Sequence, residues 1–161
     1  MTTTPRLSQK STKVEELELK DAVADTLDEA RMVLPGIQAL FGFQLVAVFN
    51  ASFGDKLSPE LQMLHYGAIV LTVLCAALIM APAAYDRLND PMTVSEWFVE
   101  YASRLITFGM VPLMISISID VFIIGMLILK NPVPSCVVAL ACAATMTLLW
   151  FILPKLITPR R

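Results

Sequence analysis

The sequence predicts an all-α bundle of four transmembrane helices, with an acidic helix at its N-terminus and a short interfacial helix before the third span. Of the 161 residues, 57% are hydrophobic and 16% are charged, whereas a soluble domain averages about 25% charged residues. The mean hydropathy of the chain is +0.69. The charged residues are also unevenly placed, and long stretches contain none. Both observations indicate that lipid surrounds most of the polypeptide.

Four windows of the sequence define the expected spans. Three of them contain no Asp, Glu, Lys or Arg, and the other contains only Asp120. Each is 23 to 25 residues long, and a helix needs roughly 20 apolar residues to cross the hydrocarbon core. The windows are residues 32–54, 61–85, 105–129 and 131–154. We expect the fourth span at about 134–153, within a membrane domain of residues 31–154.

The first 30 residues are polar and predict a cytoplasmic tail followed by an acidic amphipathic helix. Thr12 and Glu15 fit a capping box, which favours a helix start at this point. Apolar residues then recur at helical spacing, at Leu19, Val23, Leu27 and Ala30. This helix is either a solvated cytoplasmic element or a docking arm, residues 14–30, for a protein partner or a neighbouring subunit.

A second capping box, Thr93 to Glu96, predicts the short helix before the third span. Its aromatic residues, Trp97, Phe98 and Tyr101, favour the interface between lipid and water.

Turn-forming residues predict the remaining helix boundaries, and small residues predict where the helices contact one another. Ser58 and Pro59 fit the start of the second span, and residues 131–134 fit a tight turn before the fourth. Small side chains allow helices in lipid to approach closely, either within the bundle or between protomers. They follow two lines, Ala68, Thr72 and Ala76 in the second span and Ser135, Ala139, Ala143 and Thr147 in the fourth.

The distribution of Lys and Arg predicts the orientation in the membrane. The two tails and the 86–104 loop carry ten of these residues, whereas the opposite side carries only Lys56 and Lys130. Because cytoplasmic loops hold the excess of Lys and Arg, both termini are expected in the cytoplasm, including the basic tail of residues 155–161.

Several function classes do not fit the sequence. There is one histidine, the three cysteines fit no metal motif, and no phosphate loop or nucleophile–base pattern is recognisable. The pI near 5.3 argues against nucleic-acid binding. We therefore expect no enzyme, no cofactor and no metal. The expected partners are the lipid bilayer and further copies of the chain, most simply in a two-fold dimer, because one short chain encloses little space.

Asp120 is the one formal charge inside the apolar windows. An acid at the centre of a membrane helix costs about 2.5–3.5 kcal/mol on insertion scales, and such residues mark functional sites. The polar core expected around it comprises Asp120, Ser116, Asn50, His65 and Gln44.

Three interpretations of this polar core are open. It is a hydrogen-bonded group that fixes helix register, with Asp120 protonated or accepting hydrogen bonds from Asn50. Alternatively, it is a proton- or cation-binding site in a transport pathway, with Asp120 as the switching acid, or a site for a small molecule or a partner.

Three stretches of the chain resemble a bacterial family of small four-span membrane proteins of unknown function. They are Leu27-Asp28-Glu29-Ala30-Arg31, Leu34-Pro35-Gly36-Ile37-Gln38 and Met80-Ala81-Pro82-Ala83-Ala84-Tyr85-Asp86-Arg87, and Ser103-Arg104 and Ile119-Asp120-Val121 fit its third span. The resemblance covers about residues 15–130 and implies a location in the bacterial inner membrane. Some relatives carry the label sodium:proton antiporter, which implies cation and proton exchange. This chain has Asp86 where relatives have histidine.

The resemblance also marks a polar cluster at the cytoplasmic mouth of the bundle. An ion pair of Glu29 or Asp86 with Arg87 or Arg104 would join the first three spans, and the other interpretation is that these residues set topology at the interface. The cluster is Glu29, Arg31, Gln38, Tyr85, Arg87 and Arg104.

Overall fold

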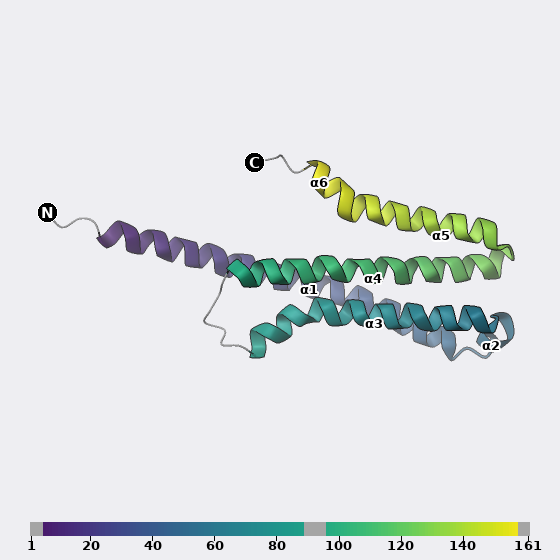
Figure 1. The fold of residues 1–161 in the computed structure, drawn as a ribbon. Coiled ribbons are helices and arrows are strands. Elements are labelled where there is room, and N and C mark those ends of the chain that lie inside the picture. The colour runs from purple at the N-terminus through teal and green to yellow at the C-terminus, as the bar shows by residue number, and fades with distance from the viewer. Residues whose placement is uncertain (1–4, 89–95, 158–161) are drawn as a thin grey trace.

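The computed structural model describes residues 5–88 and 96–157. These residues form long helices that run along one another, and none of them forms a β-strand (Figure 1). The helices are α1 (Pro5–Val48), α2 (Ser52–Lys56), α3 (Pro59–Leu88), α4 (Glu96–Leu129), α5 (Pro132–Thr147), the π-helical segment η1 (Leu148–Ile152) and α6 (Leu153–Ile157). The predicted all-α bundle is confirmed.

Four segments are long and apolar enough to cross a membrane: Leu19–Val48, Pro59–Leu88, Trp97–Leu129 and Pro132–Ile157. The last of them combines α5, η1 and α6. Large apolar side chains project away from the bundle, such as Phe43 and Phe49, which are 74% and 85% exposed. Exposed apolar surface on this scale is unfavourable in water, so the four-span prediction is confirmed in both number and chemistry.

The bundle core lies between α1, α3 and α4. Ile37 of α1 packs there with Cys75 and Ile79 of α3. At Gly109 of α4, an added Cβ would lie 3.0 Å from Ile79 Cγ1, so the missing side chain lets α4 approach α3. The start of α1 and the end of α6 lie at the same end of the bundle, and α2 lies at the other end (Figure 1).

The fourth span, α5, packs mainly against α4. Ser135 and Ala139 of α5 are buried in this contact, as are Ala68 and Thr72 of α3 in the bundle core. The two predicted lines of small residues therefore contribute to packing within one chain. The turn between the spans is tight as predicted, because the Asn131 side chain accepts a 3.0 Å hydrogen bond from the Val133 N–H at the start of α5.

The structure corrects the N-terminal boundaries. Helix α1 is unbroken from Pro5, so the Thr12–Glu15 capping box lies inside a helix, and the expected division at residues 30 and 31 is not a break in structure. Pro35 also lies inside α1, beyond the expected start of the first span.

The first span ends at Val48, not near residue 54. Asn50 turns the chain, because its side-chain Oδ1 accepts a 3.0 Å hydrogen bond from the Ser52 N–H and its backbone carbonyl accepts one from the Phe53 N–H. Asparagine competes with helical hydrogen bonds in this way, and the short helix α2 follows.

The short interfacial helix expected before the third span is the first part of α4. Trp97, Phe98 and Tyr101 lie in the first turns of α4, which continues without interruption to Leu129. Thr93 of the proposed capping box lies outside the described residues. At the other end of the chain, the fourth span passes through η1 before Pro154, whose lack of an N–H disfavours a regular α-helix there.

Candidate functional site

Polar side chains from three helices meet at one place in the otherwise apolar bundle. Gln44 of α1 donates from Nε2 to Asp120 Oδ2 of α4 over 2.7 Å and to Ser116 Oγ over 3.0 Å. Gln44 is only 3% exposed. The Gln44 amide therefore joins two groups that lie one helical turn apart on α4.

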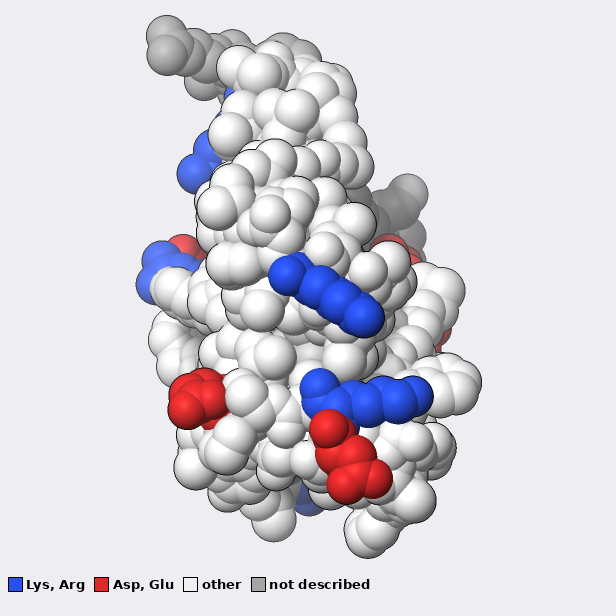
Figure 2. Space-filling model, turned by 90° about the vertical axis from the view of Figure 1, so that its right-hand side faces the viewer, with Lys and Arg blue, Asp and Glu red and all other residues white. Residues whose placement is uncertain are grey.

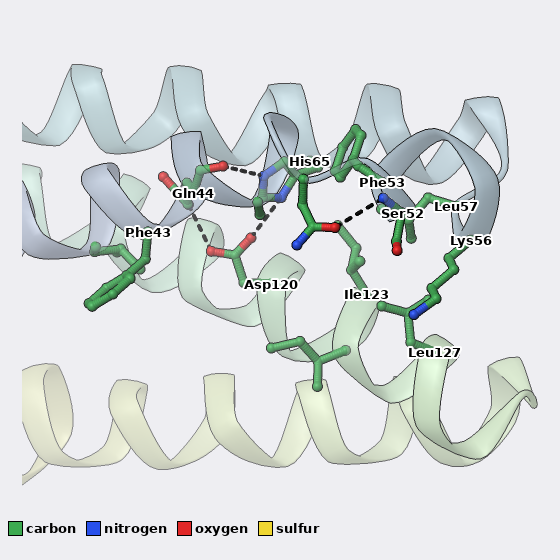
Figure 3. A pocket seen from close by; sticks show the side chains of 14 residues that line it. Phe43, Gln44, Ser52, Phe53, Lys56, Leu57, His65, Asp120, Ile123 and Leu127 are labelled. Atoms are coloured by element: carbon green, nitrogen blue, oxygen red, sulfur yellow. Dashed lines mark hydrogen bonds and ion pairs between the residues drawn. The ribbon is translucent and has the colours of Figure 1, made fainter.

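His65 brings α3 into the same cluster. Its Nε2 lies 3.0 Å from the backbone carbonyl oxygen of Gln44, and its Nδ1 lies 3.3 Å from Asp120 Oδ1 (Figure 3). The Phe53 ring packs against the imidazole with a centroid separation of 5.4 Å. The two ring nitrogens of His65 are thus held between α1 and α4.

The surroundings of the His65 ring constrain where its hydrogens lie. A carbonyl oxygen only accepts, so Nε2 carries a hydrogen. If Nδ1 were unprotonated beside an ionised Asp120, two lone pairs would face each other in a medium of low dielectric constant. One proton on His65 Nδ1 or on Asp120 would relieve this repulsion, and with that proton the pair would carry no net charge.

A second polar layer lies next to this pair. Ser116 Oγ donates to the Ala68 carbonyl oxygen over 2.9 Å and is 2.8 Å from Thr72 Oγ1. Ser116 and Thr72 are fully buried. The sequence identified Thr72 only as a small packing residue, although a hydroxyl so deep in a span could have signalled a polar contact.

A groove of about 440 Å³ opens beside the cluster, between α1, α2 and the C-terminal half of α4. Asp120 and His65 lie on its inner side, and the labelled Lys56 lies toward its far end, near Leu127 (Figure 3). The Asp120 side chain is 17% exposed. Most of the remaining wall is apolar and is formed by Leu40, Phe43, Ala47, Ile123, Ile124 and Leu127.

Two buried acceptor oxygens in this cluster have no hydrogen-bond donor among the described residues, Gln44 Oε1 and Asp120 Oδ1. The 3.3 Å contact of Asp120 Oδ1 with His65 is an ion-pair distance whose geometry falls outside that of a hydrogen bond. Buried acceptors are usually satisfied, so these two atoms have spare capacity for a donor.

The structure brings together four of the five residues predicted for the polar core: Gln44, His65, Ser116 and Asp120. Asn50 is the exception. It is exposed on the turn after α1 and lines the groove, and its Oδ1 accepts a hydrogen bond from the Ser52 N–H and not from Asp120. The predicted partner of Asp120 was therefore wrong, and Gln44 takes that position.

The second predicted cluster is not assembled. Arg31 pairs with Asp28 over 2.8 Å and Arg104 with Glu100 over 2.6 Å, and each pair lies within one helix and is exposed. Among the described residues, no ion pair joins Glu29 or Asp86 to Arg87 or Arg104. The side chains of Glu29, Gln38 and Arg87 are exposed.

Aromatic rings join α3 to α4 at this end instead. The Tyr85 ring lies 5.5 Å from Phe98, 5.9 Å from Trp97 and 5.9 Å from Tyr101 between centroids. Trp97 and Tyr101 stack at 5.2 Å. Tyr85 of the predicted mouth cluster thus has ring contacts that bridge two spans.

At the α2 end of the bundle, a few charged side chains lie within a surface that is otherwise uncharged (Figure 2). Together with the four apolar spans and the buried polar cluster, this surface defines a polytopic membrane protein. The sequence model of the family of unknown function DUF6328 matches residues 14–154, and the chain belongs to this family. No curated protein and no solved structure matches the chain.

Proposed function

We propose that this protein is a small proton- or cation-coupled transport protein of the bacterial inner membrane, with Asp120 as its switching acid. The observation that carries the proposal is the contact between Asp120 and His65 beside an open groove. Two titratable groups that share one proton can exchange it for another cation without building up charge in the membrane. A purely structural hydrogen-bonded group would gain nothing from an adjoining groove.

The orientation in this proposal places both termini in the cytoplasm. Lys56 and Lys130 belong to the segments at the α2 end of the bundle, and the other ten Lys and Arg of the sequence belong to residues 1–31, 86–104 and 155–161. We test it with Lys56→Cys and Lys20→Cys in a cysteine-free background. A membrane-impermeant maleimide should label the first in intact cells and the second only after permeabilisation, and the reverse pattern would contradict the orientation.

Transport is tested in proteoliposomes that report internal pH. The native protein should dissipate an imposed proton gradient in a cation-dependent manner, and Asp120→Asn should abolish that flux. The matched control is Asp55→Asn, which removes an exposed acid that does not line the groove. Absence of flux in the native protein, or equal flux in Asp120→Asn, would refute transport. We expect a homodimer as the working unit, and crosslinking in the same membranes checks it.

A non-catalytic scaffold is the second candidate, and the length of α1 favours it. At 1.5 Å per residue its 44 residues measure about 66 Å, against a hydrocarbon core of about 30 Å. The N-terminal part of α1 therefore extends beyond the other helices (Figure 1). Because Val23 and Ala30 are already buried, a test truncation should remove only residues 1–18. Loss of a co-purifying partner with an intact bundle would support docking, and an unchanged set of partners would count against it.

A further inference from the structure

We propose that the groove binds a monovalent organic ammonium ion with an apolar substituent, and that its binding displaces the proton shared by His65 and Asp120. This inference rests on the proposed function and deepens it, because it names the class of substrate. It follows from the wall chemistry of the groove, its two unpartnered acceptors and the charges that face it.

The dimensions and walls of the groove fit a small organic molecule. Ligand sites typically measure about 300–1,000 Å³ and combine apolar walls with a few polar groups, and this groove measures about 440 Å³. Its walls are mainly aliphatic, with the Phe43 ring at one side. Phe43 and Ile124 are also exposed, so an apolar substituent can reach the groove from the lipid.

The unpartnered acceptors indicate an N–H donor. Gln44 Oε1 and Asp120 Oδ1 are buried acceptors without donors, and both side chains line the groove. An ammonium group carries N–H donors and a positive charge, so it complements an amide oxygen and a carboxylate together. A neutral alcohol of the same shape would supply a donor without the charge.

Charge balance requires that a proton leaves when the cation enters. The ionisable groups facing Asp120 across the groove are His65 of α3 and Lys56 of α2, and Gln44 of α1 is neutral. While the shared proton is present, an added cation would leave one uncompensated positive charge in a low-dielectric site. Release of that proton from His65 or Asp120 to the solvent restores neutrality, one proton for each cation.

The same features disfavour divalent cations. A divalent metal ion is usually held by several carboxylates, and the described residues contain no group of three or more His, Cys, Asp or Glu that could hold one. A second positive charge on the ligand would meet Lys56 toward the far end of the groove (Figure 3). The expected ligand is therefore a monocation.

Titration calorimetry on the full-length protein in lipid nanodiscs tests the inference, with 3-phenylpropylammonium as the probe. Measurements in two buffers of different ionisation enthalpy give the number of protons released, which should be one for each probe bound. The pKa of an alkylammonium ion is about 10.4, like that of lysine, so the probe stays charged below that pH. The affinity should therefore rise about tenfold per pH unit while the pair is protonated. Empty nanodiscs give the background of partition into lipid.

Matched ligands and variants make the result specific. We expect at least tenfold weaker binding of 3-phenylpropanol and of a dication of equal length, and at least tenfold weaker probe binding by Asp120→Asn. Asp55→Asn should bind normally. Should Asp120→Asn fail to fold, Ala47→Phe fills the groove from its exposed wall and should weaken binding without touching the polar cluster.

Three results would overturn the inference: equal binding of the neutral alcohol, binding without proton release, or probe affinity unchanged in both Asp120→Asn and Ala47→Phe. Binding and transport can fail separately. Proton-releasing binding without flux would support the ligand site and refute transport. Proton flux without any probe binding would support transport and refute the ligand class.

Discussion

Gln44 and Asp120 lie 76 residues apart in the sequence and are joined by a 2.7 Å hydrogen bond from α1 to α4. Because the same amide also donates to Ser116, Gln44→Ala removes both of the bonds that Gln44 makes to α4. Hydrogen bonds between membrane helices average about 0.6 kcal/mol, so the loss should lower the free energy of unfolding by about 1–2 kcal/mol. Unfolding in mixed micelles of detergent and sodium dodecyl sulfate, followed by circular dichroism, measures this.

The control for that experiment is Gln38→Ala, which changes an exposed glutamine on the same helix. Exposed substitutions usually change stability by no more than about 0.5 kcal/mol. Equal destabilisation by the two variants would show that the Gln44 hydrogen bonds contribute nothing specific.

The buried hydroxyl of Ser116 provides a second test. Ser116→Ala leaves one Gln44 N–H and the Thr72 hydroxyl without this partner, which should cost about 1–2 kcal/mol in free energy of unfolding. Ser118 lies two residues further along and bonds only within its own helix, to the Met114 carbonyl, so Ser118→Ala should be nearly neutral. Similar values for both, in the same unfolding assay, would contradict the interhelical role of Ser116.

The close contact of α4 with α5 depends on Gly125. A Cβ at this position would lie 2.9 Å from Ser135 Cβ and 3.2 Å from its Cα, so Gly125→Ala must push the helices apart. Overpacking of this kind typically costs about 1–3 kcal/mol. Gly67→Ala is the matched control, since a Cβ there has no contact within 4 Å and alanine favours a helix by about 1 kcal/mol. The temperature of thermal unfolding should therefore fall for Gly125→Ala and rise for Gly67→Ala. A higher unfolding temperature for Gly125→Ala would show that the two helices are not in close contact at this position.

Tyr85 should anchor the end of α3 to the start of α4. Tyr85→Ala removes ring contacts with Trp97, Phe98 and Tyr101, and aromatic pairs contribute about 0.5–1.5 kcal/mol each. We expect lower thermal stability and altered fluorescence from Trp97. Tyr66→Ala, at a position 62% exposed on the same helix, should change neither. Unaltered fluorescence in Tyr85→Ala would mean that the rings are not in contact.

The number and type of spans could be predicted because lipid excludes charged side chains from the whole length of a membrane helix. A charged side chain is costly in lipid wherever it lies, so uncharged windows of 23 to 25 residues identify membrane helices without any knowledge of contacts. Helix ends depend on single local bonds. Asn50 leaves the helix because its side chain bonds Ser52 N, a choice that composition does not reveal.

The candidate site was predicted in part, because polar residues inside apolar spans can be recognised from the sequence. Asp120, Ser116, His65 and Gln44 stand out as polar residues in apolar spans, and the structure brings them together. Thr72 was missed because threonine also serves as an ordinary small packing residue. Asn50 was included because its depth was counted along a helix that ends at Val48. Spacing along one helix does not determine which helices meet.

The position of α5 outside the polar cluster has a consequence for how the protein is made. Every side chain of the polar cluster belongs to α1, α3 or α4, and α5 packs mainly on the outside of α4. The ribosome therefore finishes the three helices that build the cluster before it reaches residue 132. The nascent chain can form the Gln44–Asp120 hydrogen bond while its last span is still being synthesised. That span then packs against a bundle that is already assembled.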